Sequence, residues 1–136
     1  MNAAGAKVLV VDDESEMTDS LTDCLKAQGY QTFTAKDGIS AVNAARSEKP
    51  DIILLDLMLP LLDGFRILKL LKTDERYRGI PIVVITARAN AEDWTLAMEC
   101  GADGWLTKPV RMEELLEKVR AIVVNKRVER ILGREI

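Results

Sequence analysis

Histidine is absent from the 136-residue sequence, and cysteine, proline and aromatic residues are scarce. The lack of histidine excludes Ser-His-Asp triads, histidine-ligated zinc and any chain that carries a phosphohistidine of its own. The two cysteines, Cys24 and Cys100, have neither a zinc-ligand spacing nor a disulfide framework. No run approaches the roughly 20 apolar residues of a membrane span, and residues 1–6 lack the pattern of a secretory signal. We therefore expect a cytoplasmic protein without membrane contact.

Charge of neither sign dominates, with 19 basic and 22 acidic side chains and a net charge of -3. The 48% hydrophobic and 30% charged content is typical of one ordinary globular domain. Residues 1–107 hold 11 basic and 17 acidic side chains, whereas residues 108–136 hold 8 and 5. The acidic balance predicts no direct nucleic-acid binding by the domain, and the basic tail is interpreted as a solvated helix face.

Short apolar runs alternate with segments of helical period. The predicted strands span residues 7–11, 30–35, 51–55, 82–85 and 104–106. Helices are predicted over 15–28, 64–73, 91–100 and from 111 onward. A further helix is predicted between Asp37, its N-cap, and Pro50, which ends it. In that helix Ile39, Val42 and Ala45 form the expected inward stripe. Strict alternation predicts an α/β fold with a parallel sheet, right-handed crossovers and helices on both faces. Residues 1–124 form the predicted domain, and 125–136 a C-terminal helix extension or linker.

Polar residues stand where the predicted strands end. Asp12 and Asp13 follow the first strand, Asp56 the third, Thr86 the fourth and Lys108 the fifth. Open α/β sheets bind ligands outside the carboxyl ends of their strands, so these five groups should converge on one shallow pocket.

The chemistry of these groups is specific. Clustered carboxylates without cysteine or histidine favour Mg²⁺ or Mn²⁺. Lys108 and Thr86 offer a cation and a hydroxyl donor to phosphoryl oxygens, and one carboxylate remains as the nucleophile of an aspartyl phosphate. Taken singly, the aspartates could be helix caps or turn residues, Thr86 a strand terminator and Lys108 a surface cation. Their joint position at strand ends favours the functional interpretation.

The sequence resembles the CheY-like receiver domains of two-component response regulators over residues 7–124. Four motifs carry the resemblance, in the order VVDDE (10–14), LDLMLP (55–60) followed by Asp63-Gly64, ITA (85–87) and GADGWLTKP (101–109). The resemblance implies a flavodoxin-like (βα)5 domain whose doubly wound, five-stranded parallel sheet has the strand order 2-1-3-4-5. It also implies a phosphoacceptor that assists its own phosphorylation and dephosphorylation rather than an enzyme.

The resemblance implies roles for single residues. Asp56 would accept a phosphoryl group from a histidine kinase or a histidine phosphotransfer protein. Asp13, Asp56 and the Met58 backbone carbonyl would bind Mg²⁺, with Asp12 acting through the metal's waters. Thr86 and Lys108 would contact the phosphoryl group, and the bond before Pro109 would be cis.

A switch and a readout surface are also implied. Thr86 would move toward the phosphoryl group and Trp105 would turn inward behind it, unless the bulky Trp105 is a fixed apolar plug. The readout surface would comprise the fourth helix, the fifth strand and the fifth helix. Its partner would be a downstream protein or an output domain, and a homodimer could form on phosphorylation.

Two departures from the usual pattern lie beside the expected pocket. Met58, two residues past Asp56, is a poor group for orienting water, so we expect slow hydrolysis of the aspartyl phosphate. Arg88 could cover the phosphoryl group or point to solvent, and Leu61 and Leu62 indicate local packing or a contact patch.

Three other functions remain as alternatives. The first is an aspartyl-phosphate phosphatase of the haloacid dehalogenase type, although Met58 stands where that class has a second aspartate. The others are a small nucleotide or flavin binder, disfavoured by the lack of Gly-rich phosphate motifs, and a degenerate receiver that takes no phosphate. The tail could be a frayed helix, a parallel dimer seam through Ala121, Val124, Val128 and Ile131, or the start of a helix toward an output domain.

Overall fold

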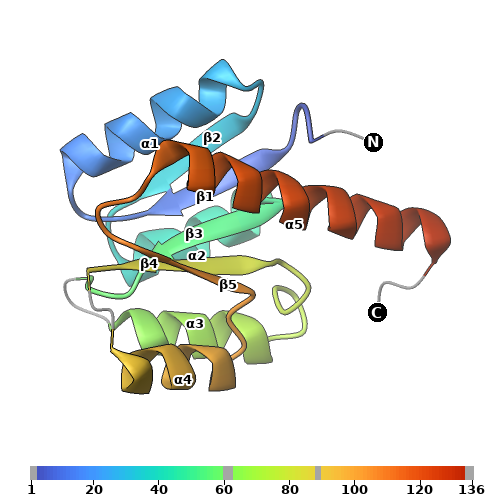
Figure 1. Ribbon diagram of the computed structural model, residues 1–136. Coiled ribbons are helices and arrows are strands. Elements are labelled where there is room, and N and C mark those ends of the chain that lie inside the picture. The colour runs from blue at the N-terminus through green and yellow to red at the C-terminus, as the bar shows by residue number, and fades with distance from the viewer. Residues whose placement is uncertain (1–2, 60–62, 88–89, 134–136) are drawn as a thin grey trace.

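Strands and helices alternate strictly through the part of the chain that the structure describes, as can be followed in Figure 1. The computed structural model describes residues 3–59, 63–87 and 90–133. Leu61 and Leu62, interpreted from the sequence as local packing or a contact patch, and Arg88, interpreted as a phosphoryl cover or a solvent-facing side chain, lie outside the described residues. The strands are β1 (Lys7–Val11), β2 (Gln31–Ala35), β3 (Ile52–Asp56), β4 (Ile82–Thr86) and β5 (Gly104–Thr107). The helices are α1 (Ser15–Ala27), α2 (Gly38–Glu48), α3 (Gly64–Thr73), α4 (Ala91–Glu99) and α5 (Met112–Leu132).

All strand pairs are parallel and the strand order is β2-β1-β3-β4-β5, which confirms the predicted doubly wound sheet. Helices α1 and α5 cover one face, and α2, α3 and α4 cover the other (Figure 1). Every residue of β3 and β4 is buried, because helices cover both faces of these central strands. The order reverses direction between β1 and β3, so the ends of these two strands border a natural ligand site.

Side-chain alternation divides the core into two clusters. Val10 and Leu54 belong to the cluster beneath α1 and α5, whereas Leu9, Leu55 and Val84 belong to the one beneath α2, α3 and α4. Successive side chains of a strand point to opposite faces, so the register of the sheet decides which polar residues at the strand ends face each other.

The start of α2 is predicted correctly, and two of the three residues in its predicted stripe face the core, since Ala45 is buried and Val42 is partly buried against it. The Asp37 carboxylate accepts a hydrogen bond of 2.8 Å from the Ser40 N–H and caps the helix. Ile39, however, is 68% exposed, and the buried positions of the helix are Gly38, Ala41 and Ala45. These small residues let α2 lie close to the sheet, which turns Ile39 toward solvent.

Helix α5 continues without a break through the segment predicted as an extension or linker. It reaches Leu132 and ends at Gly133, whose φ of 68° is the left-handed conformation common at helix ends. The end of α5 projects beyond the sheet in Figure 1, and Ile131 and Leu132 are exposed. Among the described residues, no helix is both long enough and apolar enough to cross a membrane.

Candidate functional site

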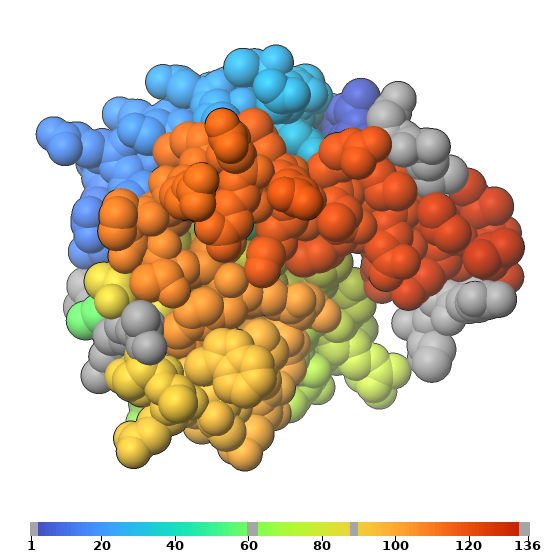
Figure 2. All heavy atoms as spheres, viewed as in Figure 1, coloured from blue at the N-terminus to red at the C-terminus, as the bar shows by residue number. Residues whose placement is uncertain are grey.

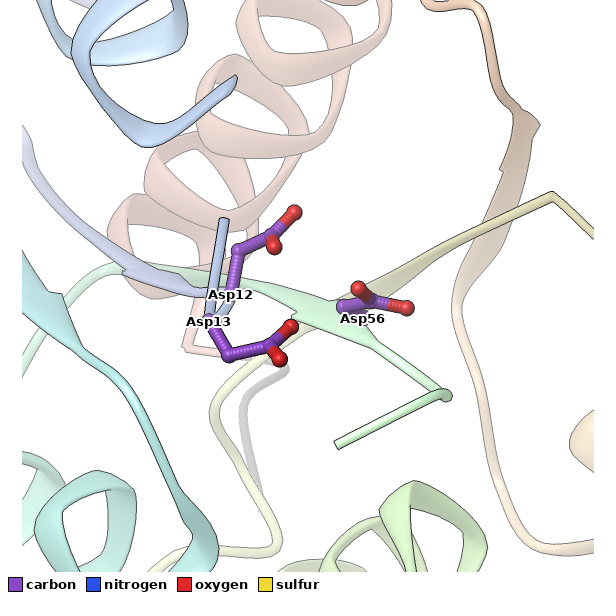
Figure 3. Close-up of side chains that lie close together, drawn as sticks. All are labelled: Asp12, Asp13 and Asp56. Carbon is purple, nitrogen blue, oxygen red and sulfur yellow. The ribbon is translucent and has the colours of Figure 1, made fainter. Parts of the chain in front are cut away.

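Three aspartates meet at the carboxyl ends of β1 and β3. Figure 3 shows Asp12 and Asp13, directly after β1, lying beside Asp56 at the end of β3. One carboxylate oxygen from each lies within 4.8 Å of the other two. Asp12 and Asp56 are each only 3% exposed, whereas Asp13 is open to solvent. The structure therefore brings together the three carboxylates that the sequence predicted.

Backbone amides fix one oxygen of each buried carboxylate. The Glu14 N–H donates to Asp12 Oδ1 and the Met58 N–H donates to Asp56 Oδ1, each at 2.9 Å. Both bonds join residues two apart, the Asx-turn geometry that follows an aspartate at a strand end. These bonds leave the Oδ2 atoms of Asp12 and Asp56 free to face a shared partner.

Lys108 is that shared partner. Its ammonium lies 3.0 Å from Asp12 Oδ2, 3.0 Å from Asp56 Oδ2 and 3.4 Å from Glu14 Oε1. The Lys108 backbone N–H donates to the Thr86 carbonyl at 2.8 Å, which fixes the chain just past the end of β5. The Lys108–Pro109 bond is cis, as predicted.

Burial and charge act in opposite directions in this cluster. Burial raises the pKa of Asp56 above its ordinary value, although hydrogen bonds from the Met58 N–H and Lys108 oppose the shift. Burial also lowers the pKa of Lys108, but the hydrogen bonds to Asp56 and Asp12 outweigh it, and the net pKa lies above the ordinary lysine value. Lys108 is therefore fully charged at neutral pH, yet one ammonium cannot neutralise three carboxylates.

The donor set fits a hard divalent cation. Each of the three aspartates offers a carboxylate oxygen within the 4.8 Å cluster, with no sulfur or imidazole ligand. Oxygen-only sites with few carboxylates suit Mg²⁺ or Mn²⁺ rather than zinc. The role of the Met58 carbonyl as a metal ligand stays a prediction, since the hydrogen bond of Met58 to Asp56 is made by its N–H.

Thr86 and Trp105 lie on the side of the sheet covered by α2, α3 and α4. Thr86 is fully buried at the end of β4 and pairs with Thr107 of β5. Trp105 pairs with Val84, and its indole N–H donates to Thr107 Oγ1 at 3.2 Å. Side chains alternate along a strand, so Trp105 and Thr107 share the face of Val84 and Thr86. The proposed movement of these residues stays a prediction, but the sheet places them side by side.

Two features of the site were not assigned a role from the sequence. Glu14 supplies a third carboxylate to Lys108, although it is 62% exposed. Gly64 lies so close to β3 that an added Cβ would stand 2.7 Å from the Leu57 carbonyl oxygen and 2.8 Å from that of Asp56. The Asp63-Gly64 pair was a usable signal for Gly64, whereas the reach of Glu14 depends on tertiary structure.

Comparison with known proteins assigns the chain to a family. The family model "Response regulator receiver domain" matches residues 8–120. The chain belongs to the response-regulator receiver domain family. It is 39% identical over 121 residues to the DNA-binding response regulator MtrA of Mycobacterium tuberculosis, covering 89% of this chain and 52% of MtrA. It is 40% identical over 117 residues to the phosphate regulon transcriptional regulatory protein PhoB of Klebsiella pneumoniae, covering 86% and 51%. The chain thus spans about half the length of the curated relatives it matches.

Solved structures show the same architecture. The CheY-like receiver domain protein of Methanospirillum hungatei has a TM-score of 0.85 at 26% identity, with 93% of this chain and 99% of that chain covered. The chemotaxis response regulator CheY4 of Vibrio cholerae has a TM-score of 0.80 at 33% identity, with 85% and 97% covered. The chain is therefore a CheY-like receiver domain of two-component signalling, and these findings do not support the phosphatase alternative.

Proposed function

We propose that Asp56 is the phosphoacceptor of this receiver domain and takes its phosphoryl group from a phosphohistidine of a histidine kinase or a histidine phosphotransfer protein. The observation that carries the proposal is the position of the Asp56 carboxylate. It is almost fully buried, lies beside Asp12 and Asp13, and is held 3.0 Å from the Lys108 ammonium. A structural aspartate needs neither the adjacent carboxylates nor the buried lysine.

In the transfer, an Asp56 carboxylate oxygen attacks the phosphorus atom. A P–O bond forms, the P–N bond of the phosphohistidine breaks, and its electron pair stays on the imidazole nitrogen of the partner. Lys108 already lies beside the reacting carboxylate, so its positive charge is available to phosphoryl oxygens without rearrangement of the chain.

Asp12, Asp13 and Asp56 would hold Mg²⁺ or Mn²⁺, with the Met58 carbonyl as a further ligand. When bound, the metal supplies positive charge that offsets the repulsion between these carboxylates and the incoming phosphoryl group. The Thr86 hydroxyl, at the end of the neighbouring strand, donates a hydrogen bond to the phosphoryl group. The chain is a phosphoacceptor in a single self-directed transfer, not an enzyme that turns over an external substrate.

The signal leaves the domain through the surface formed by α4, β5 and α5. Movement of Thr86 toward the phosphoryl group changes the space beside Thr107 and Trp105, which lie on the same face of the sheet. The relative MtrA is a DNA-binding response regulator. We infer that a downstream protein or output domain reads the surface formed by α4, β5 and α5 in this chain. Phosphorylation-dependent homodimers and a cytoplasmic location belong to the same proposal.

Intact-protein mass tests the proposal. The chain is incubated with acetyl phosphate, with and without Mg²⁺, beside the variants Asp56→Asn and Asp23→Asn. Asp23, an exposed aspartate of α1, controls for the loss of one carboxylate. We expect the mass of one phosphoryl group only with Mg²⁺, in the parent chain and in Asp23→Asn. A gain by folded Asp56→Asn, or no gain by the parent chain, would overturn the assignment.

A further inference from the structure

A second candidate site lies at the opposite end of the strands from Asp56, where β3 and β4 begin. A cavity of about 490 Å³ opens at the amino ends of β3 and β4, where Pro50 and Pro81 line it. A second cavity of about 340 Å³ shares Pro50, Arg76, Ile80 and Arg130 with the first. Both volumes fall in the range of small-molecule sites in proteins. The proposed phosphoacceptor chemistry uses none of these residues.

Basic side chains surround this pair of cavities. The lining holds five cations and two carboxylates, although residues 1–107 as a whole are acidic. The cations are Arg46, Lys49, Arg76, Arg78 and Arg130, and the carboxylates are Asp51 and Glu75. A concave site with an excess of one charge concentrates ions of the opposite sign, so this edge of the sheet attracts anions.

Three of these cations have no carboxylate partner among the described residues. In the part of the chain that the structure describes, no carboxylate oxygen lies within 4.0 Å of the charged groups of Arg46, Lys49 or Arg78. Arg76 differs, because it forms two hydrogen bonds with the Asp74 carboxylate, at 2.8 and 3.1 Å. An arginine offers paired donors that match phosphate oxygens, and a lysine adds a point charge.

The floor of the smaller cavity is apolar. Ala45, Pro50 and Tyr77 are buried there, and Ile80 is partly buried. The Arg76 guanidinium lies over the Tyr77 ring, 5.0 Å from its centre, so a charged group borders this floor directly. An inorganic anion would use the rim alone, whereas a ligand with both an apolar ring system and phosphoryl groups would use the rim and the floor.

The end of α5 forms one wall of both cavities. Arg130 lines each of them, and its guanidinium lies 3.7 Å from Asp51, which precedes β3. Figure 2 shows the red end of α5 standing clear of the green segment below it, with a recess between them. A ligand in this position would contact both the body of the domain and the helical extension.

We propose that these two neighbouring cavities bind one nucleoside polyphosphate, with its phosphates on the basic rim and its nucleoside on the apolar floor. The proposal is independent of phosphorylation at Asp56 and would stand if that assignment failed. The basic site is also distinct from the acidic cluster, because the acidic cluster repels phosphate groups when no metal is present.

Isothermal titration calorimetry in low salt with EDTA tests the proposal on the full chain, with ATP, pyrophosphate and adenosine as probes. EDTA prevents metal-assisted binding of phosphates at the acidic cluster. Arg46→Gln and Lys49→Asn each remove one rim charge, and asparagine tolerates the φ of 48° at residue 49. Arg66→Gln is the matched control, since Arg66 is an exposed residue of α3 outside the lining.

We expect ATP to bind at one site and to bind more tightly than pyrophosphate, with no heat from adenosine. Arg46→Gln and Lys49→Asn should each weaken ATP binding by about tenfold, the loss of one charge-assisted hydrogen bond, and Arg66→Gln should leave it unchanged. The proposal is overturned if ATP at millimolar concentration gives no binding or if Arg66→Gln weakens it equally. Pyrophosphate binding at least as tight as that of ATP would overturn it as well.

Discussion

The Lys108 ammonium lies 3.0 Å from Asp56 Oδ2, although the two residues are 52 positions apart in the sequence. The same nitrogen contacts Asp12 Oδ2 at 3.0 Å, so one cation joins the ends of β1 and β3 to the segment after β5. The lysine side chain is 11% exposed and its two aspartates 2–3% exposed, so water screens these contacts little. Lys108 is therefore the counter-charge of the acidic cluster, and in the proposed function it also meets the phosphoryl oxygens.

Replacement of Lys108 by methionine should lower the stability of the metal-free domain. The variant leaves Asp12 and Asp56 buried without their cation, and loss of one partner from a buried pair is strongly destabilising. We expect the free energy of unfolding in urea to fall by about 3–5 kcal/mol at pH 7. Glu14→Gln is the control, since the exposed Glu14 contact should contribute less than about 1 kcal/mol. Equal stability of Lys108→Met and the parent chain would contradict this reading of the cluster.

Gly64→Ala should be strongly destabilising. The added Cβ would stand 2.7 Å from the Leu57 carbonyl oxygen and 2.8 Å from the Asp56 carbonyl oxygen, and backbone atoms cannot move aside as a side-chain end can. We expect a loss of about 3 kcal/mol in thermal or urea unfolding. Gly79→Ala is the matched control, because its nearest neighbour would be the end of the Lys126 side chain at 3.9 Å. Equal losses of stability in the two alanine variants would contradict the close packing of α3 against the end of β3.

The Asp74–Arg76 pair predicts a pH-dependent contribution to stability. Hydrogen bonds from the Arg76 guanidinium and, to a smaller extent, from the Arg76 backbone N–H lower the pKa of Asp74 from 3.8 to about 2. A carboxyl whose pKa is lower in the folded state stabilises the fold at pH values above its unfolded pKa, and this contribution is lost as the pH falls toward the folded pKa. The parent chain should therefore exceed Asp74→Asn in stability at pH 5. The difference should shrink between pH 4 and pH 2 in a urea-unfolding series, and a constant difference would refute the assignment.

Met58 should slow the loss of the phosphoryl group. The side chain is 53% exposed beside Asp56, and its thioether is a weak acceptor that orients an attacking water poorly. We expect Met58→Asn to shorten the half-life of the phosphorylated protein several-fold, measured by intact mass after removal of the phosphodonor. Met58→Leu is the control, and its half-life should match that of the parent chain. A half-life that hardly changes in Met58→Asn would count against this role.

Much of the fold was predictable because burial leaves a clear pattern in the sequence. The runs that became β3 and β4 are continuously apolar because helices cover both faces of these strands. The parallel arrangement followed from strict alternation, and the convergence of Asp12, Asp56 and Lys108 followed from their places at strand ends. Ala45 is buried as the stripe predicted, but Ile39 was misplaced because its apolar character does not reveal that α2 begins its packing through the small residues Gly38 and Ala41.

Other features depend on tertiary structure alone. Three carboxylates share Lys108, but spacing along the chain did not show that Glu14 would be the third. The basic cavities are made by segments distant in sequence, with Arg46 from α2 and Arg130 from α5. No local motif joins such residues, so the second site could not be predicted before the position of the α5 extension was known.

Peptide mapping of the phosphorylated residue is the sharpest test that Asp56 is the phosphoacceptor. After reaction with acetyl phosphate and Mg²⁺, borohydride reduction converts an aspartyl phosphate to homoserine, which is stable to proteolysis and visible in the fragment mass. We expect homoserine at residue 56 alone, with Asp12 and Asp13 recovered unchanged. Homoserine at residue 12 or 13, or at no residue of a folded chain, would contradict the assignment of Asp56 as the phosphoacceptor.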